Sequence, residues 1–147
     1  MEERIQALIK YHDADLLPIE QAHDGEWFDL RCAEDVVMSA GEFRVLSLGV
    51  TIRIPDGYEI IIAPRSSTYK SWGILLANSL GVIDQRYGQD ESDIIRFPAL
   101  AMRDTEIHKN DRICQFRFQK CQPKVQLLRV NWISGEARGG LGSTGRS

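Results

Sequence analysis

The stretch LGVTIRIPDGYEIIIAP, residues 48–64, decides the fold. Apolar and polar side chains alternate on both sides of a Pro-Asp-Gly turn, with the apolar positions at Val50, Ile52, Ile54, Tyr58, Ile60 and Ile62. A period of two residues is typical of a half-buried β-strand, and a turn between two such runs is typical of a hairpin. We therefore expect two strands that are joined at residues 55–57 and pair with each other.

The same alternation recurs along the chain and predicts an all-β domain. In RICQFRFQ it places two sets of side chains on opposite faces, Cys114, Phe116 and Phe118 on one and Ile113, Gln115 and Arg117 on the other. Shorter runs predict strands at Ala7–Tyr11, Trp27–Cys32, Phe43–Leu46, Ile74–Ala77, Ile94–Phe97, Thr105–His108 and Val125–Val130. Many short strands separated by Pro and Gly favour a sandwich or jelly-roll barrel. One short helix is expected in SSTYKSWG, capped by Ser66 or Ser67 and ended by Gly73.

Length and charge exclude several classes of function. With 147 residues the chain has the size of one domain. A net charge of −3 argues against a surface that binds nucleic-acid phosphates. No apolar run approaches the ~20 residues of a membrane span, and the charged N-terminus lacks a secretory signal. We expect a cytoplasmic protein without nucleic-acid or membrane partners.

The cysteines and histidines do not have the spacing of metal ligands. The three cysteines include no C-x-x-C pair and the three histidines are scattered, at Cys32, Cys114, Cys121, His12, His23 and His108. Zinc sites in proteins draw on closely spaced pairs of such residues. We expect core thiols and surface imidazoles.

The segment APRSSTYKSWG combines groups that bind phosphate. Arg65, Ser66 and Ser67 lie between the end of a strand and the start of the short helix. A guanidinium group, two hydroxyls and free amides together suit phosphate oxygens. A capped helix beside a surface arginine is the plainer interpretation of this segment alone.

The segment NSLGVIDQRY carries groups suited to a nucleoside. Asn78 offers a donor and an acceptor that match a uracil edge, and Gly81 lets the backbone approach a ligand. Tyr87 supplies a flat face for a sugar or base, and Asp84 is a carboxylate able to deprotonate a water. We interpret the segment as a β-hairpin. Taken singly, each residue also has a structural interpretation, as a turn residue, a packed ring or a bulge.

Five ordered segments together resemble the trimeric deoxyuridine triphosphatase (dUTPase) family. They are FDLR around Asp29, PRSS at 64–67, NSLGVID with Tyr87 at 78–87, NDRICQF at 110–116 and RGGLGSTG at 138–145. The resemblance covers nearly the whole chain. It implies a jelly-roll homotrimer with shared active sites that hydrolyses dUTP to dUMP and pyrophosphate with Mg²⁺, thereby keeping uracil out of DNA and supplying dUMP for dTMP synthesis.

The resemblance assigns a role to each matching residue. Asp84 would activate the water that attacks the α-phosphorus, and Asp29 would hold Mg²⁺ through water. Phosphate oxygens would be bound by Arg65, Ser66, Ser67 and Gln115. The uracil edge would be read by Asn78 and the backbone around Gly81, while Tyr87 would pack on the deoxyribose and exclude a 2′-hydroxyl.

The C-terminal segment EARGGLGSTGRS would be a flexible lid. Under this interpretation residues 1–133 form the jelly-roll domain and residues 134–147 form an arm that closes over a neighbouring subunit's site. The residues that would contact the nucleotide are Arg138, Leu141, Gly142, Ser143 and Thr144. Family members commonly have an aromatic ring where this chain has Leu141, so we expect a weaker lid and a higher KM.

The sequence also departs from the family after Tyr87, and alternatives stay open. The acidic stretch GQDESD replaces the usual arginine-glycine and resembles phage and Firmicute variants. Its loop, Gly88–Asp93, is a plausible contact surface of a dUTP-sensing phage regulatory protein. A dCTP deaminase of the same fold needs a further carboxylate on the next strand, and DIIRFPALAM contains no glutamate. A purely structural jelly roll would leave Asp84, Tyr87 and Arg138 unconnected.

Overall fold

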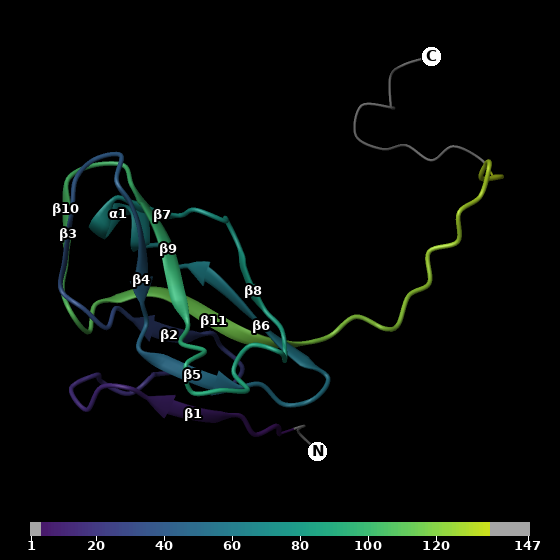
Figure 1. Cartoon of the computed structure of the whole chain (residues 1–147), viewed down its shortest axis with the longest axis horizontal. Coiled ribbons are helices and arrows are strands. Elements are labelled where there is room, and N and C mark those ends of the chain that lie inside the picture. Colours follow the sequence, from purple (N-terminus) through teal and green to yellow (C-terminus); the bar gives the residue numbers. More distant parts are fainter. Residues whose placement is uncertain (1–3, 136–147) are drawn as a thin grey trace, which may run out of the picture.

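The computed structural model describes residues 4–135 of the chain. Within this range the chain forms strands and one short helix (Figure 1). In chain order the elements are β1 (Leu8–Tyr11), β2 (Phe28–Arg31), β3 (Val36–Met38), β4 (Phe43–Ser47), β5 (Val50–Arg53), β6 (Tyr58–Pro64), α1 (Thr68–Trp72), β7 (Ile74–Leu76), β8 (Gly81–Ile83), β9 (Arg96–Ala101), β10 (Thr105–Ile107) and β11 (Arg112–Lys120).

The strands form small antiparallel sheets. The largest has the order β2-β11-β6-β8, and a second has the order β4-β9-β7. Two further pairs join β1 to β5 and β10 to β3. The predicted all-β, jelly-roll-like fold with one short helix is confirmed.

Strand β6 runs through the centre of the largest sheet. It pairs with β11 on one edge and β8 on the other, and its three consecutive residues Ile60, Ile61 and Ile62 are all buried. Burying one such side chain contributes ~1.5–3 kcal/mol relative to leaving it exposed. On β2 and β11, the rings of Phe28 and Phe116 stack with centroids 5.2 Å apart and extend this core. The core therefore fixes β2, β6 and β11, the strands that carry or adjoin the candidate site residues.

The hairpin predicted for residues 50–62 is wrong in its pairing. Both strands exist, but β5 pairs with β1 and β6 pairs with β11 and β8. The turn itself forms, because the Tyr58 amide donates to the Pro55 carbonyl over 3.2 Å. It carries the chain from one sheet to another, as turns in a sandwich often do. The segment at 78–87 is likewise no local hairpin, since its strand β8 pairs with β6.

Other strand predictions are confirmed to within a few residues, with three exceptions. The strand expected at Ile94–Phe97 begins at Arg96 and continues to Ala101. Strand β3 was not predicted. Residues 125–130 lie in no strand, and their side chains are exposed.

The helix begins and ends where the sequence predicts, without the predicted side-chain cap. Ser67 is at the N-cap position but makes no side-chain capping hydrogen bond. Gly73 ends the helix with φ of 63°, in the left-handed region. The serine side chains near this turn are therefore not committed to capping.

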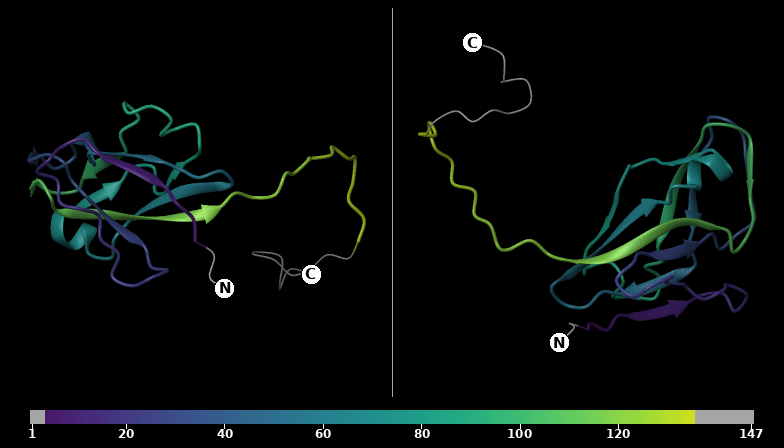
Figure 2. Two further views of the ribbon diagram at one scale, coloured as in Figure 1. Left: turned by 90° about the horizontal axis from the view of Figure 1, so that it is seen from below. Right: turned by 180° about the vertical axis from the view of Figure 1, so that it is seen from behind.

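Beyond β11 the chain leaves the body of the domain. Residues 121–135 lie in no helix or strand and extend away from the sheets (Figure 2). Their apolar side chains are exposed at Val125, Leu127, Leu128, Val130, Trp132 and Ile133. We call residues 121–135 the apolar arm. Within residues 4–135, no helix has the length and apolar character to cross a membrane.

The cysteine and histidine predictions hold with one exception. Cys32 and Cys114 are fully buried, and burial raises the pKa of the Cys32 thiol to about 11, so it stays protonated at neutral pH. The histidines are on the surface as expected. Cys121 is exposed and is not a core thiol, because it follows the last residue of β11.

Candidate active site

Four predicted site residues from separate segments line one cavity of about 740 Å³. They are Asp29 on β2, Arg65 and Ser66 between β6 and α1, and Gln115 on β11. Neighbouring strands bring them together, because β11 pairs with both β2 and β6. We call this hollow the Arg65 cavity.

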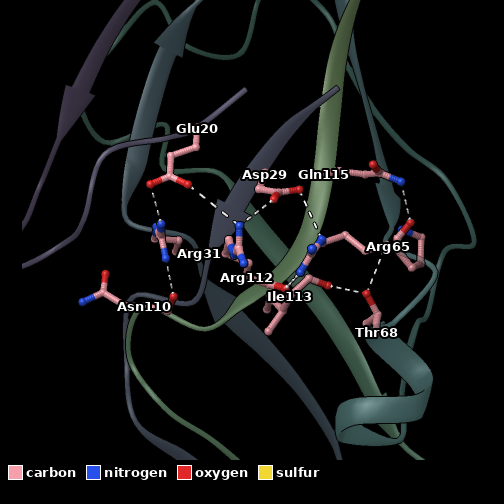
Figure 3. Close-up of polar contacts among 10 residues, drawn as sticks. Glu20, Asp29, Arg31, Arg65, Thr68, Asn110, Arg112, Ile113 and Gln115 are labelled. Atoms are coloured by element: carbon pink, nitrogen blue, oxygen red, sulfur yellow. Dashed lines mark hydrogen bonds and ion pairs between the residues drawn. The ribbon is translucent and has the colours of Figure 1, made fainter. Parts of the chain in front are cut away.

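The guanidinium group of Arg65 is held in place by two contacts (Figure 3). Its Nε lies 3.2 Å from Asp29 Oδ1, and one terminal nitrogen donates to the Arg112 carbonyl over 2.9 Å. Both side chains of the Asp29–Arg65 pair are largely buried, with 22% and 26% exposure. An arginine fixed in this way is preorganised to bind anions.

Thr68 supports this arrangement from beneath, and sequence analysis missed it. Its fully buried hydroxyl donates to the Ile113 carbonyl and accepts the Arg65 amide hydrogen, both over 2.8 Å (Figure 3). One side chain therefore connects the start of α1, the end of β6 and β11. In the sequence, Thr68 only extends the polar run Arg65-Ser66-Ser67 by one residue. The burial of its side chain was therefore not visible there.

Gln115 and Ser66 complete the wall of the Arg65 cavity. The Gln115 amide nitrogen donates to the Pro64 carbonyl over 3.0 Å, which fixes the orientation of the side chain. Ser66 is exposed at the cavity, and Ser67 is half-buried beside it. Hydroxyl and amide groups in this position can bind phosphate oxygens.

Asp29 does not have the surroundings of a direct metal ligand. One carboxylate oxygen faces Arg65 and the other lies 3.5 Å from a terminal nitrogen of Arg112 (Figure 3). Glu20 also approaches Arg112, at 3.8 Å. In residues 4–135 no group of three or more acidic, histidine or cysteine side chains is placed to hold a metal ion. The donors in this described range therefore do not form a metal site by themselves.

Asp84 and Tyr87 line a second, smaller hollow of about 310 Å³, together with Val82, Ile83, Ile95 and Arg96. The Asp84 carboxylate accepts the Arg86 amide hydrogen over 2.9 Å and guanidinium hydrogens over 2.7 and 3.2 Å. These hydrogen bonds from Arg86 lower the pKa of Asp84 below its ordinary value. An ionised carboxylate at the surface can accept a proton from water. Arg86 is a contact that sequence analysis missed.

Asn78 and Gly81 lie on either side of an exposed turn before β8. Ser79, between them, has φ of 62°. A Cβ atom at Gly81 would lie 3.1 Å from the Ile62 Cβ, so packing against β6 accounts for the glycine. The expectation that Gly81 lets the backbone approach a ligand is therefore not needed to explain this residue.

The predicted residues thus fall into two groups. The cavity with Asp29, Arg65 and Gln115 and the hollow with Asp84 and Tyr87 share no lining residue. Residues predicted in the C-terminal segment lie outside the part of the chain that the structure describes: Arg138, Leu141, Gly142, Ser143 and Thr144.

Comparison with known proteins finds relatives that match nearly the whole chain. The dUTPase family model matches residues 16–145. The SPbeta prophage-derived deoxyuridine 5'-triphosphate nucleotidohydrolase YosS of Bacillus subtilis is 49% identical over 141 residues, covering 96% of this chain and 99% of the relative. The deoxyuridine 5'-triphosphate nucleotidohydrolase of Nautilia profundicola is 34% identical and is covered over 96% of its length, with 93% of this chain matched.

Solved structures show the same fold. The structure of the Staphylococcus bacteriophage 80alpha dUTPase with dUPNHPP superposes with a TM-score of 0.77 at 19% identity and covers 95% of this chain and 98% of that chain. The dUTPase from Streptococcus mutans superposes with a TM-score of 0.71 at 24% identity, covering 80% and 98%. From the family match and the identity with full-length relatives, the chain belongs to the dUTPase family.

Proposed function

We propose that the protein hydrolyses dUTP to dUMP and pyrophosphate, with Asp84 as the general base. The observation that carries the proposal is the Arg65 cavity, where residues from three motif segments converge beside the Arg65 guanidinium in a chain of this family. In this role Asp84 takes a proton from the water that attacks the α-phosphorus. General-base catalysis of this kind contributes ~10²–10⁴-fold in rate.

The Arg65 cavity would bind the triphosphate. Arg65 is already oriented by Asp29, so it pays little entropy when it meets phosphate oxygens. Ser66, Ser67 and Gln115 would supply hydroxyl and amide groups. The acidic residue beside the arginine also keeps the unliganded cavity from carrying an unpaired half-buried charge.

The second hollow would hold the nucleoside. In this proposal Asn78 and the backbone near Gly81 bind the uracil edge, and the Tyr87 ring packs on the deoxyribose. Tyr87 is 37% exposed beside Asp84, so its face is accessible to a sugar. Product dUMP would supply dTMP synthesis, and removal of dUTP would keep uracil out of DNA.

Magnesium would enter with the substrate. Because Asp29 is engaged by two arginines, we propose that Mg²⁺ arrives as the Mg·dUTP complex, in which phosphate oxygens and water supply its ligands. One bacteriophage phi11 dUTPase structure describes a structural Mg(II) ion. In our proposal Asp29 orients the Arg65 guanidinium and does not coordinate the ion directly.

We propose a homotrimer with shared sites, and the separation of the two groups supports this proposal. One chain does not bring Asp84 into the Arg65 cavity, so the hollow of one subunit would face the cavity of another. Exposed apolar side chains offer the surface for such contacts: Phe43, Val45 and Leu75 on the β4-β9-β7 sheet, and those of the apolar arm. The segment with Arg138 and Leu141 to Thr144 would then close over the nucleotide as a lid.

A pyrophosphate-release assay tests the reaction. We expect turnover of dUTP with Mg²⁺ and little turnover of UTP, dTTP or dCTP. Ammonia release from dCTP would instead indicate a deaminase. Intact dUTP after incubation with folded protein and Mg²⁺ would contradict the proposed function.

Mixing two inactive variants tests the shared sites. Asp84→Asn removes the base and Arg65→Ala removes the phosphate contact, so each homotrimer has only defective sites. After subunit exchange, random mixing leaves about a quarter of the sites with both intact groups. Recovered activity is expected, and no recovery in proven mixed trimers would contradict sharing.

A further inference from the structure

The loop after Tyr87 has a specific internal architecture that involves Asp93. One oxygen of the Asp93 carboxylate accepts the Gly88 amide hydrogen over 2.9 Å and the Asp90 amide hydrogen over 3.3 Å. The Asp93 amide in return donates to the Asp90 carbonyl over 3.0 Å. Gly88 is buried, so its amide hydrogen needs an acceptor within the protein. Asp93 supplies it.

Asp93 also connects the two points that hold the Tyr87 ring. The Tyr87 hydroxyl donates to the Ile94 carbonyl over 2.5 Å. Ile94 directly follows Asp93, and Gly88 directly follows Tyr87. The hydrogen bond from Gly88 to Asp93 therefore closes a ring of contacts that includes both the backbone and the hydroxyl of the tyrosine.

This ring of contacts lies against strand β5 with little room to move. Gly88 has φ of 108°, and a Cβ atom there would lie 2.0 Å from the Ile52 carbonyl oxygen. Arg53 donates to the Gln89 carbonyl over 3.1 Å, and the Thr51 hydroxyl donates to the Glu91 carbonyl over 2.8 Å. The loop is thus attached to β5, and Tyr87 at its start lines the hollow with Asp84.

We propose that Asp93 is a positioning residue for Tyr87 and thereby sets the preference of the site for deoxyribose over ribose. The inference rests on the proposed function, in which Tyr87 packs on the sugar. A Tyr87 side chain that is fixed at both its backbone and its hydroxyl leaves no space for a 2′-hydroxyl. If its backbone end is released, the aromatic ring can tilt and admit a 2′-hydroxyl, because a shift of about 1 Å is enough to alter reactivity strongly.

The experiment measures sugar selectivity, defined as kcat/KM for dUTP divided by kcat/KM for UTP. We expect Asp93→Ala to lower this ratio about tenfold or more, and Asp93→Asn, which keeps an acceptor oxygen, to lower it less. The matched control is Asp90→Ala, which removes a charge from the same loop but from a carboxylate that accepts hydrogen bonds from Ser92. This control is expected to keep the wild-type ratio.

Amide exchange supplies a readout that does not depend on turnover. Without nucleotide, the Gly88 amide hydrogen is expected to exchange faster in Asp93→Ala than in wild type or Asp90→Ala, while β6 amides stay protected. An unchanged selectivity ratio in folded Asp93→Ala overturns the inference. If that variant does not fold, an unchanged ratio in Asp93→Leu, which has a similar size and no acceptor oxygen, does so. Equal losses in the Asp93 and Asp90 variants overturn it as well. Wild-type protein that cleaves no dUTP overturns the proposed function instead.

Discussion

The Arg65 cavity and the hollow at Asp84 are held by different means. Arg65 is supported by Asp29, by the Arg112 carbonyl and by the buried Thr68 hydroxyl, all on strands or helix ends fixed by the core. Asp84 is bound by Arg86, a neighbour two residues away whose side chain is 91% exposed. The comparison shows that the Arg65 cavity is preorganised within one chain. The hollow with the general base Asp84 depends on local contacts and, in our proposal, on a second subunit.

The largest expected effect comes from replacing the proposed general base, Asp84. Asp84→Asn is expected to lower kcat by ~10²–10⁴-fold because the amide cannot accept the water proton. The fold should be unaffected, since the carboxylate is at the surface and its contacts are with Arg86. Pyrophosphate release and thermal unfolding measure the two properties. Near-normal turnover in this variant would exclude Asp84 as the base.

The rigidity of the Arg65 cavity is tested at Thr68. Thr68→Val keeps the shape but leaves the Ile113 carbonyl and the Arg65 amide without their partner, which costs ~1–3 kcal/mol of unfolding free energy. We also expect weaker substrate binding through displacement of Arg65. Denaturant unfolding and KM measure these effects, with Thr68→Ser as the control that keeps the hydroxyl. Equal stability of the Val and Ser variants would show that the hydroxyl has no such role.

A smaller effect is expected from Arg86 and appears in the pH profile. Arg86 lowers the pKa of Asp84, so wild-type Asp84 stays ionised to lower pH. Arg86→Gln should return that pKa toward its ordinary value, and the acid limb of kcat/KM should therefore move to higher pH. The pair is exposed, so the difference should shrink at high salt. Superimposable profiles at low salt would rule out this influence.

The smallest effect is expected at Leu141. Leu141→Phe would give the proposed lid an aromatic face to stack on uracil, and KM for dUTP should fall with little change in kcat. Leu141→Ile is the matched control, with similar size and no ring. A KM that does not respond to the ring would mean that residue 141 does not contact the base.

Sequence periodicity predicted most elements but not their partners. The strands at 50–54 and 58–62 were correctly predicted, yet each pairs with segments far away in the chain. Alternation reports which face of a strand is buried, and it carries no information about its neighbours in the sheet. Val125–Val130 shows the converse, because a strand-like composition that has no pairing partner within residues 4–135 forms no strand.

The same limit applies to the site. The family resemblance assigned Asp29, Arg65, Ser66 and Gln115 to the triphosphate and its Mg²⁺, and these four residues line one cavity. The ion pair between Asp29 and Arg65 was not predictable, because it depends on β11 separating β2 from β6 in the sheet. Thr68 and Asp93 act through burial and local hydrogen bonds, which residue type alone does not reveal.

The apolar arm has a consequence for the lifetime of the protein. Exposed segments without secondary structure are preferred sites of proteolytic cleavage. One cut within residues 121–135 would leave every strand from β1 to β11 in place and detach Arg138 together with the glycine-rich end. Until subunit contacts cover the apolar arm, a protease could therefore remove the residues of the proposed lid without unfolding the domain.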